Sequence, residues 1–392
     1  MLCPKCGKEN PDNVGTCTAC NYELPAVSVE GKRVDVQISK MAVASSLCAL
    51  VGLVCSLLLL VIAVVNPLVL DRDSLLFLLS GWVTQLAMVV SFCLGVAALV
   101  QISASAGRRT GQGFAVIGLA VPFILFLLVM WLPALAREME TALRGRCGAN
   151  LMGIGKAMLI YADDYQDQLP RAGGPGTVWQ PKINNWQAQD RFDAYGLTPD
   201  GRGGAAGISA SLYLLIKYAG LLPNSFLCPY DHSMSEFKPT KYNVRDQELT
   251  SVWDFGPEPW KHCSYAYHMP YSLYALTTSS EPGIGVAADR GPWIDSPFAK
   301  ARNFRLFKPD GDIKQQKAGN SLVHQEDGQN VLFMDGHVYF EKRAFCAIND
   351  DNIYTFWDGS DIRRGAPPII GSQPQDRRDS LLVHDPPVAA RK

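Results

Sequence analysis

The sequence predicts a multidomain protein: a small cysteine-rich metal-binding unit, about three transmembrane helices, and an α+β domain whose long N-terminal helix packs on an antiparallel sheet. Three observations lead to this class. Two Cys-x-x-Cys pairs open the chain, three long uncharged segments follow, and a helical stripe then precedes β-rich runs. We expect the parts to be 1–25 (ribbon), 26–40 (linker), 41–135 (membrane helices), 136–364 (α+β domain) and 365–392 (disordered tail).

Four cysteines form the metal-binding pattern. Cys3 and Cys6 make one Cys-x-x-Cys pair, and Cys17 and Cys20 make the second. Four thiolates at this spacing can close a tetrahedron around Zn²⁺. Gly7 and Asn21, which follow the pairs, tolerate the positive φ that such a turn needs. Two disulfides are the alternative. The segment resembles the zinc ribbons of bacterial proteins, with a structural or partner-binding metal and no open position for catalysis.

The uncharged segments run from Met41 to Leu70, from Ser74 to Gly107 and from Thr110 to Ala136. A membrane span needs roughly 20 apolar residues, so each segment is long enough. A buried hairpin of a soluble protein is the alternative, but these helices would have no polar face. We expect spans at about 41–66, 74–100 and 113–135, with the lipid bilayer as partner.

The basic residues predict an orientation. Lys32, Arg33 and Lys40 precede the first span, and Arg108 and Arg109 separate the second from the third. The positive-inside rule then places the N-terminus in the cytoplasm and the chain after the third span outside. Basic residues after the third span argue mildly the other way: Arg137, Arg144 and Arg146. The formal net charge of −1 gives no sign of the basic face that nucleic-acid binding requires.

A helical stripe follows the third span. Its members recur at steps of three and four: Leu143, Cys147, Leu151, Ile154, Met158, Tyr161 and Tyr165. This spacing predicts that the membrane helix continues as an amphipathic helix packed on a core. Four cysteines lie in this exported part, in an oxidising space, and at least one disulfide is expected among Cys147, Cys228, Cys263 and Cys346. Sequence does not choose the pairing, although Cys228 is the member most expected to take part. A nucleophilic Cys228 is the alternative, but sequence can place no partner histidine for it.

Motifs in the same order as in a large bacterial family span residues 113–358. They are Cys147–Leu151, Ile154–Ala157, Tyr161–Tyr165, Phe226–Asp231, Ser264–Tyr267, Ala288–Arg290 and Asn320–Val338. Together they resemble a pseudopilin-like family (type II secretion protein G-like), whose C-terminal motif is a histidine followed about ten residues later by Asp-Gly. Here His324, Asp335 and Gly336 match it. The resemblance implies a pilin-like fold and a bacterial inner membrane location.

Two further features qualify this resemblance. The basic leader, the Gly cleavage site and the early Glu of a true prepilin are missing from the third span, so we expect a permanent anchor. The second and third spans resemble a small multi-span membrane domain of unknown function, through the glycine-rich segments Leu94–Leu99 and Gly111–Ala120. That resemblance implies an anchor or a partner-binding role.

The polar motif residues have two interpretations each. Asp335-Gly336 between β-rich runs predicts a hairpin turn in which both residues have positive φ. We expect His324, Asp335 and His337 to act in turn and loop hydrogen bonding, and the alternative is that they are metal ligands or an acid–base set. Asp163, Asp164 and Asp167 end the long helix as a solvated acidic cluster or as a Ca²⁺ site.

The sequence therefore predicts a non-enzymatic, membrane-anchored pseudopilin-like protein. Its exported head and its cytoplasmic ribbon would contact protein partners on both sides, in envelope or secretion assembly. Nucleophile elbows, Walker loops and His-Glu-x-x-His helices are missing from the sequence. The alternatives are a zinc-ribbon adaptor or sensor with a sensing head, and a metal-dependent enzyme in the exported domain.

Overall fold

The computed structural model describes residues 2–11, 14–24, 37–65, 75–105, 108–244 and 247–388. Two compact units divide the chain, Met1–Arg137 and Glu138–Lys392. Most of the predicted linker and the loop between the first two predicted spans lie outside the described residues.

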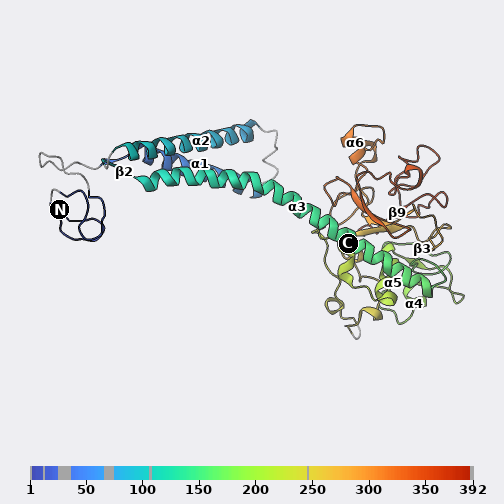
Figure 1. The fold of residues 1–392 in the computed structure, drawn as a ribbon. Helices are drawn as coiled ribbons and strands as arrows, with labels where there is room; N and C mark the ends of the chain where they lie inside the picture. Colours follow the sequence, from blue (N-terminus) through green and yellow to red (C-terminus); the bar gives the residue numbers. More distant parts are fainter. Residues whose placement is uncertain are drawn as a thin grey trace. The chain divides into compact units, whose positions relative to one another are not determined.

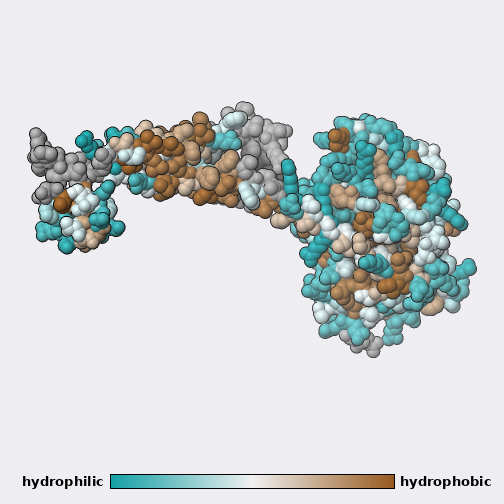
Figure 2. Space-filling view, viewed as in Figure 1, coloured by the Kyte–Doolittle hydropathy of each residue, from teal (hydrophilic) through white to brown (hydrophobic). Residues whose placement is uncertain are grey.

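The first unit contains the apolar helices (Figure 1). They are α1 (Lys40–Val65), α2 (Leu75–Ala104) and the first part of α3 (Gln112–Asp164). Lys40–Leu57 in α1 and Thr84–Ala104 in α2 are long and apolar enough to cross a membrane, and only 22% of each is buried. In α3 the apolar stretch is shorter, Gln112–Leu128. Figure 2 shows hydrophobic residues gathered over these helices.

Small residues bring the three apolar helices together. Ser45 of α1 and Ser91 of α2 each donate a hydrogen bond to the other's carbonyl oxygen at 2.8 Å. Ser91 also donates to the carbonyl of Gly118 in α3, at 2.9 Å. A Cβ on Gly118 would lie 1.7 Å from the Ser45 hydroxyl, so only glycine permits this approach. The first unit also contains a short parallel pair, β1 (Gln37–Ile38) with β2 (Arg109–Thr110).

Helix α3 runs without a break over 53 residues, from Gln112 to Asp164. The predicted continuation of the apolar helix into an amphipathic one is therefore confirmed. In the second unit the stripe is buried, with Leu151 and Ile154 both 0% exposed. A Cβ on Gly155 would lie 2.9 Å from Leu332, so this glycine lets α3 approach the sheet closely.

The second unit is built on a five-stranded antiparallel sheet with the order β8-β7-β6-β5-β9 (Figure 1). Its strands are β5 (Tyr265–His268), β6 (Gly285–Asp289), β7 (Gln329–Phe333), β8 (Val338–Glu341) and β9 (Leu382–Val383). Around it lie α4 (Arg191–Tyr195), α5 (Ile208–Ala219), α6 (Ile313–Lys317) and the parallel pair β3 (Val178–Trp179) and β4 (Ala205–Ala206). Short 3₁₀ turns are η1 (Pro223–Phe226), η2 (Pro239–Tyr242), η4 (Leu249–Ser251), η5 (Pro259–Lys261), η6 (Phe304–Leu306) and η7 (Ile348–Asp350).

Both faces of this sheet are covered. Alternate residues of a strand belong to different cores, as the two-residue period of a strand requires. Leu332 joins the core that includes α3 and α5, whereas its neighbours Val331 and Phe333 join a second core. That second core is filled by aromatic and apolar residues from the connecting segments, among them Trp293, Phe307, Phe345, Ile353 and Tyr354. The long helix therefore covers one face only.

The predicted disordered tail is wrong for the residues described, which extend to Val388. Leu382 and Val383 form the edge strand β9, paired with β5, and both are buried. The Asp385 carboxylate accepts hydrogen bonds from the backbone N–H groups of Ile208 (3.0 Å) and Ser209 (2.8 Å) at the start of α5. These N–H groups have no partner within the helix, so the tail supplies one. This strand was not predicted because the residues on either side of it are rich in proline and charge, a composition typical of disorder.

The Asp335-Gly336 hairpin is present, but its turn differs from the prediction. Strands β7 and β8 pair antiparallel on either side of it. Gly336 has φ of 86°, while Asp335 is not among the residues with positive φ. The connection is longer than two residues, closed by hydrogen bonds from Phe333 N–H to His337 O and from Gly336 N–H to Phe333 O, both 3.0 Å. A longer loop relieves Asp335 of the left-handed conformation.

Candidate metal centres

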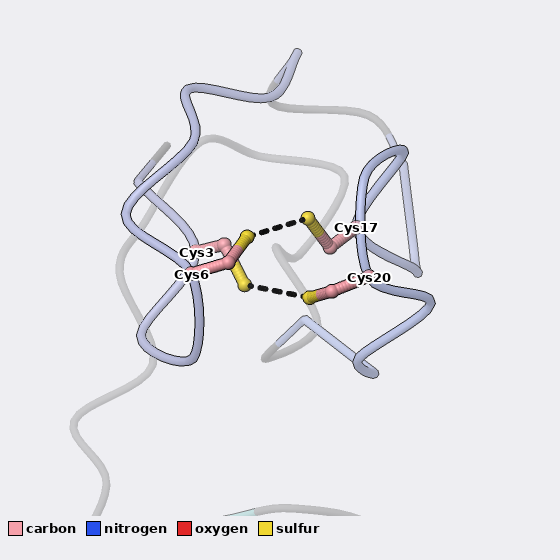
Figure 3. A group of neighbouring side chains, drawn as sticks. All are labelled: Cys3, Cys6, Cys17 and Cys20. Carbon is pink, nitrogen blue, oxygen red and sulfur yellow. Dashed lines mark hydrogen bonds between the residues drawn. The ribbon is translucent and has the colours of Figure 1, made fainter.

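The four N-terminal cysteines converge, as their spacing predicts (Figure 3). Sγ of Cys3 lies 3.6 Å from Sγ of Cys20, and Sγ of Cys6 lies 3.6 Å from Sγ of Cys17. Two ligands of one tetrahedral zinc, each at about 2.3 Å from the metal, would be about 3.8 Å apart. The sulfur atoms therefore fit Zn²⁺, and all four are within 4.8 Å of one another.

Local backbone geometry builds each half of this site. Gly7 and Asn21 have φ of 71° and 54°, the predicted positive values. The N–H of Gly7 donates to the carbonyl of Cys3 at 2.9 Å, and that of Asn21 to the carbonyl of Cys17 at 3.0 Å. These turns fold each Cys-x-x-Cys pair so that both thiols face the same point.

Asn10 completes the site, and sequence reasoning missed it. Its side-chain amide donates to Sγ of Cys17 at 3.4 Å and its oxygen accepts from the N–H of Thr18 at 2.9 Å. Backbone hydrogen bonding at Ala19, with smaller effects that include Asn10, lowers the pKa of Cys17 to about 6. Hydrogen bonds that favour a thiolate suit a metal ligand.

Residues 2–24 match a zinc-ribbon domain. The zinc ribbon is thus supported by a family match and by geometry, and its four cysteines would hold Zn²⁺ with no position left open. No curated protein and no solved structure matches the chain. The comparisons therefore give no support to the pseudopilin resemblance of residues 113–358.

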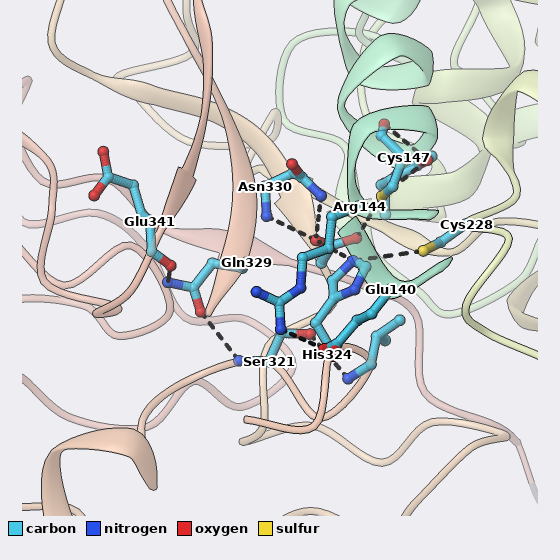
Figure 4. A network of polar contacts seen from close by, with 12 residues as sticks. Glu140, Arg144, Cys147, Cys228, Ser321, His324, Gln329, Asn330 and Glu341 are labelled. Atoms are coloured by element: carbon cyan, nitrogen blue, oxygen red, sulfur yellow. Dashed lines mark hydrogen bonds and ion pairs between the residues drawn. The ribbon is translucent and has the colours of Figure 1, made fainter. Parts of the chain in front are cut away.

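A second cluster lies in the head, the unit Glu138–Lys392 (Figure 4). It contains Cys147 on α3, Cys228 after η1, Asp289 at the end of β6 and His324 between α6 and β7. Figure 4 labels Cys147, Cys228 and His324 of this cluster. Asp289 Oδ1 accepts a hydrogen bond from the Cys147 thiol at 2.9 Å, and Asp289 Oδ2 lies 3.2 Å from His324 Nε2. Sγ of Cys228 lies 3.7 Å from the same nitrogen. All four side chains are at most 2% exposed.

Aromatic and polar groups enclose this cluster. The His324 ring lies 5.2 Å from the ring of Tyr230 and 5.7 Å, edge-on, from that of Phe340. The hydroxyl of Tyr265 is 3.4 Å from Sγ of Cys147. Asn330 donates its backbone N–H to Asp289 Oδ2 at 2.8 Å. The surroundings therefore exclude water and orient Asp289.

Charge pairing decides the electrostatics of Asp289 and His324. Burial alone would raise the pKa of Asp289, but the neighbouring imidazolium of His324 holds that pKa below its usual range. Burial would likewise lower the pKa of His324, yet Asp289 raises it to about 10. Without a metal the two groups therefore form a buried ion pair.

The other predicted residues lie elsewhere. All eleven cysteines carry free thiols in the structure, and Cys263 and Cys346 belong to neither metal-ligand group. Asp335 pairs with His337 at the exposed hairpin and is separate from the His324 cluster. In the described part of the chain, Asp163, Asp164 and Asp167 form no such group with one another. The expected disulfide among Cys147, Cys228, Cys263 and Cys346 stays a prediction.

The structure corrects two interpretations of the sequence. His324, expected to act in turn and loop hydrogen bonding, is wholly buried against Asp289. Cys228, for which sequence could place no partner histidine, faces His324. Asp289 was only a landmark of the resemblance. The signal available in the sequence was that Cys147, Cys228, Asp289 and His324, all of residue types that bind metals, each lie in a different motif of the resemblance.

Proposed function

We propose that this chain is a non-enzymatic, membrane-anchored protein with a pseudopilin-like head and a zinc ribbon, and that both make protein contacts. The observation that carries the proposal is helix α3, which begins as an apolar stretch and ends in the core of the head. A long helix of this kind, packed on one face of an antiparallel sheet, supports the pilin-like assignment. The anchor would consist of α1, α2 and the apolar part of α3.

The chemistry of the two metal-ligand groups favours binding over catalysis. The ribbon has four cysteine ligands, and the ligands of the second cluster are wholly buried. A catalytic metal site needs a position open to water or substrate. The closed ligand sets therefore favour a role in protein interaction over the activity of a metal-dependent enzyme.

Reporter fusions test the arrangement across the membrane. We expect cytoplasmic signals for fusions after residues 40 and 109, and external signals after residues 72 and 170, from the basic residues beside the spans. Alkaline phosphatase and a fluorescent protein would report the two sides. A cytoplasmic signal at 170 would refute the exported head.

The head offers a surface for a protein contact where α3 passes β8. A groove of about 390 Å³ lies there, lined by Lys156, Asn330 and a set of small or apolar residues: Gly145, Gly148, Ala149, Met152, Gly153 and Val338. Met152 is 43% exposed, and β8 is an edge strand. Exposed edges and apolar grooves are surfaces on which proteins pair.

Photo-crosslinking tests this surface in the full chain in its native membrane. A photoreactive amino acid at Met152 is expected to give a discrete crosslinked species. The same amino acid at Leu273, which is 96% exposed and outside the groove, is the matched control. Equal or absent crosslinking at the two positions would count against a contact through the groove.

The zinc ribbon can be separated from the head in a parallel experiment. Cys17→Ser should release the ribbon's zinc and leave the melting of the head unchanged, because the two lie in different units. If this variant also loses a cytoplasmic partner, the ribbon is the interacting part, and the result favours the alternative of a zinc-ribbon adaptor. If every contact made by the wild type survives in it, the ribbon is only a structural element.

A further inference from the structure

The buried cluster of the head gathers side chains far apart in sequence. Cys147 and Asp289 are 142 positions apart, and Cys228 and His324 are 96 apart. Each of the four offers one ligand atom, and those atoms all lie within 4.8 Å of one another. Two thiols, one imidazole and one carboxylate make up the donor set.

We propose that Cys147, Cys228, Asp289 and His324 form a second zinc site, which binds one tetrahedral Zn²⁺ inside the head. Thiolate, imidazole and carboxylate are the ligands that zinc takes in proteins. This site goes beyond the function proposed above, because it concerns how the head is held together.

Two distances at His324 match the edges of a zinc tetrahedron, while Cys147 makes a thiol hydrogen bond of 2.9 Å to Oδ1, the other oxygen of Asp289. With usual metal–ligand lengths, a nitrogen and an oxygen ligand would be about 3.3 Å apart, and a sulfur and a nitrogen ligand about 3.6 Å. The corresponding distances are 3.2 Å between His324 Nε2 and Asp289 Oδ2, and 3.7 Å between His324 Nε2 and Cys228 Sγ. The zinc ribbon of the same chain shows the same close agreement, with Sγ atoms 3.6 Å apart.

A metal also explains why both thiols face the ion pair. A disulfide would join Cys147 and Cys228 at about 2.05 Å, whereas both are free thiols in the structure. The ion pair of Asp289 and His324 has no net charge, so neither sulfur atom is needed to balance it. Zn²⁺ gives each of the four groups a charged partner, which is what buried ionisable groups require.

The proton and charge balance is complete within the site. Binding Zn²⁺ sends the two thiol protons and the Nε2 proton of His324 to solvent. Two thiolates, a carboxylate and Zn²⁺ leave one net negative charge. Two hydrogen-bond donors stabilise this negative charge. The N–H of Asn330 donates to Asp289, and the Tyr265 hydroxyl is placed to donate to Cys147.

A zinc ion here would tie the anchor helix to the sheet. Cys147 lies on α3, Asp289 ends β6, and Cys228 and His324 come from connecting segments. Four protein ligands without solvent access make a structural centre. The expected consequence is a head that loosens around α3 when the metal is removed.

Zinc counting on the full chain, purified in detergent under reducing conditions, tests the site. The wild type should contain about two Zn²⁺ per chain, one in the ribbon and one in the head, since the described residues contain two such ligand groups. Cys17→Ser and His324→Ala should each leave one. Cys263→Ser, at a buried cysteine outside both groups, is the matched control and should keep two.

Two measurements keep the proposal falsifiable if a variant fails to fold. His324→Cys restores a zinc ligand and should retain the second metal, whereas His324→Ala should not. The other is made on the wild type alone. One zinc per folded wild-type chain would overturn the proposal, and so would an intact mass about 2 Da below that of the reduced chain, with a peptide joining Cys147 to Cys228.

Discussion

At the scale of single residues, the head contains carboxyl groups in places that do not suit a charge. Asp351 is 1% exposed and its Oδ2 accepts the N–H of Ser380 at 2.7 Å. Burial, followed by the nearby carboxylate of Asp379, raises its pKa from 3.8 to about 8. The folded head therefore holds a proton on Asp351 that the unfolded chain has lost at neutral pH.

Asp351→Asn should stabilise the head, and increasingly so as the pH rises. The folded pKa lies above the unfolded one, so the protonated carboxyl contributes stability that is complete below pH 3.8 and is lost toward pH 8. The neutral side-chain amide of the Asp351→Asn variant does not titrate, so the variant keeps its stability as the pH rises. We expect the melting temperature of the variant to exceed that of the wild type by more at pH 8 than at pH 5, by several degrees.

Asp350→Asn is the control for this prediction. Asp350 is the residue just before Asp351 and is exposed, so the same substitution there removes a carboxyl group from the surface. Its effect on melting should be small at every pH. A difference between wild type and Asp351→Asn that does not change with pH would show that Asp351 is ionised in the folded head.

At the scale of elements, α3 decides how the head is assembled. Its stripe was readable from the sequence because a helix repeats every 3.6 residues. Which surface receives the stripe was not readable. The close approach at Gly155 and Leu332 shows that β7 lies beneath it.

Leu151→Ala should therefore destabilise the head by about 2–5 kcal/mol, because it opens a cavity in a core where Leu151 is wholly buried. Met152→Ala on the same helix should change stability by less than about 1 kcal/mol, because Met152 is 43% exposed. Urea denaturation followed by tryptophan fluorescence measures both. Equal losses would mean that α3 does not pack through the stripe.

The C-terminal strand makes a prediction of the same kind. Val383 is 0% exposed in β9, whereas Val388, a few residues later, is 41% exposed. Val383→Asp should lower the melting temperature strongly or prevent folding, since it buries an unpaired charge. Val388→Asp should not. Protease digestion would distinguish the two variants. Only in the Val383 variant should the C-terminal segment leave the sheet and be cleaved.

At the scale of the whole molecule, most of the surface of the apolar helices is exposed within the chain itself. Trp82, Leu86 and Val100 are between 62% and 71% exposed. Apolar surface of this extent on helices of this length has to be covered by lipid or by another protein. We expect lipid.

Carbonate extraction of membranes tests that expectation. The chain should stay in the membrane pellet at high pH and enter solution only with detergent. A variant with Leu86→Lys and Val100→Glu, both on α2, should shift part of the protein to the soluble fraction. Complete release of the wild type by carbonate would refute a spanning anchor.

Several features were predictable from the sequence because their signals are local. The zinc-ribbon cysteines lie within eighteen positions of one another, and turn geometry at Gly7 and Asn21 is enough to aim them. The apolar helices follow from composition, and the stripe from periodicity. The Asp335-Gly336 hairpin was placed correctly, although its turn type was wrong, because loop length depends on how the strands register.

Other features depend on the tertiary structure. The cluster of Cys147, Cys228, Asp289 and His324 exists only after the sheet has formed and α3 has packed on it. The C-terminal strand exists because β5 offers an open edge and the start of α5 needs the carboxylate of Asp385. Contacts between distant segments are selected by the shape and hydrogen-bonding needs of the whole core. No window of neighbouring residues contains that information.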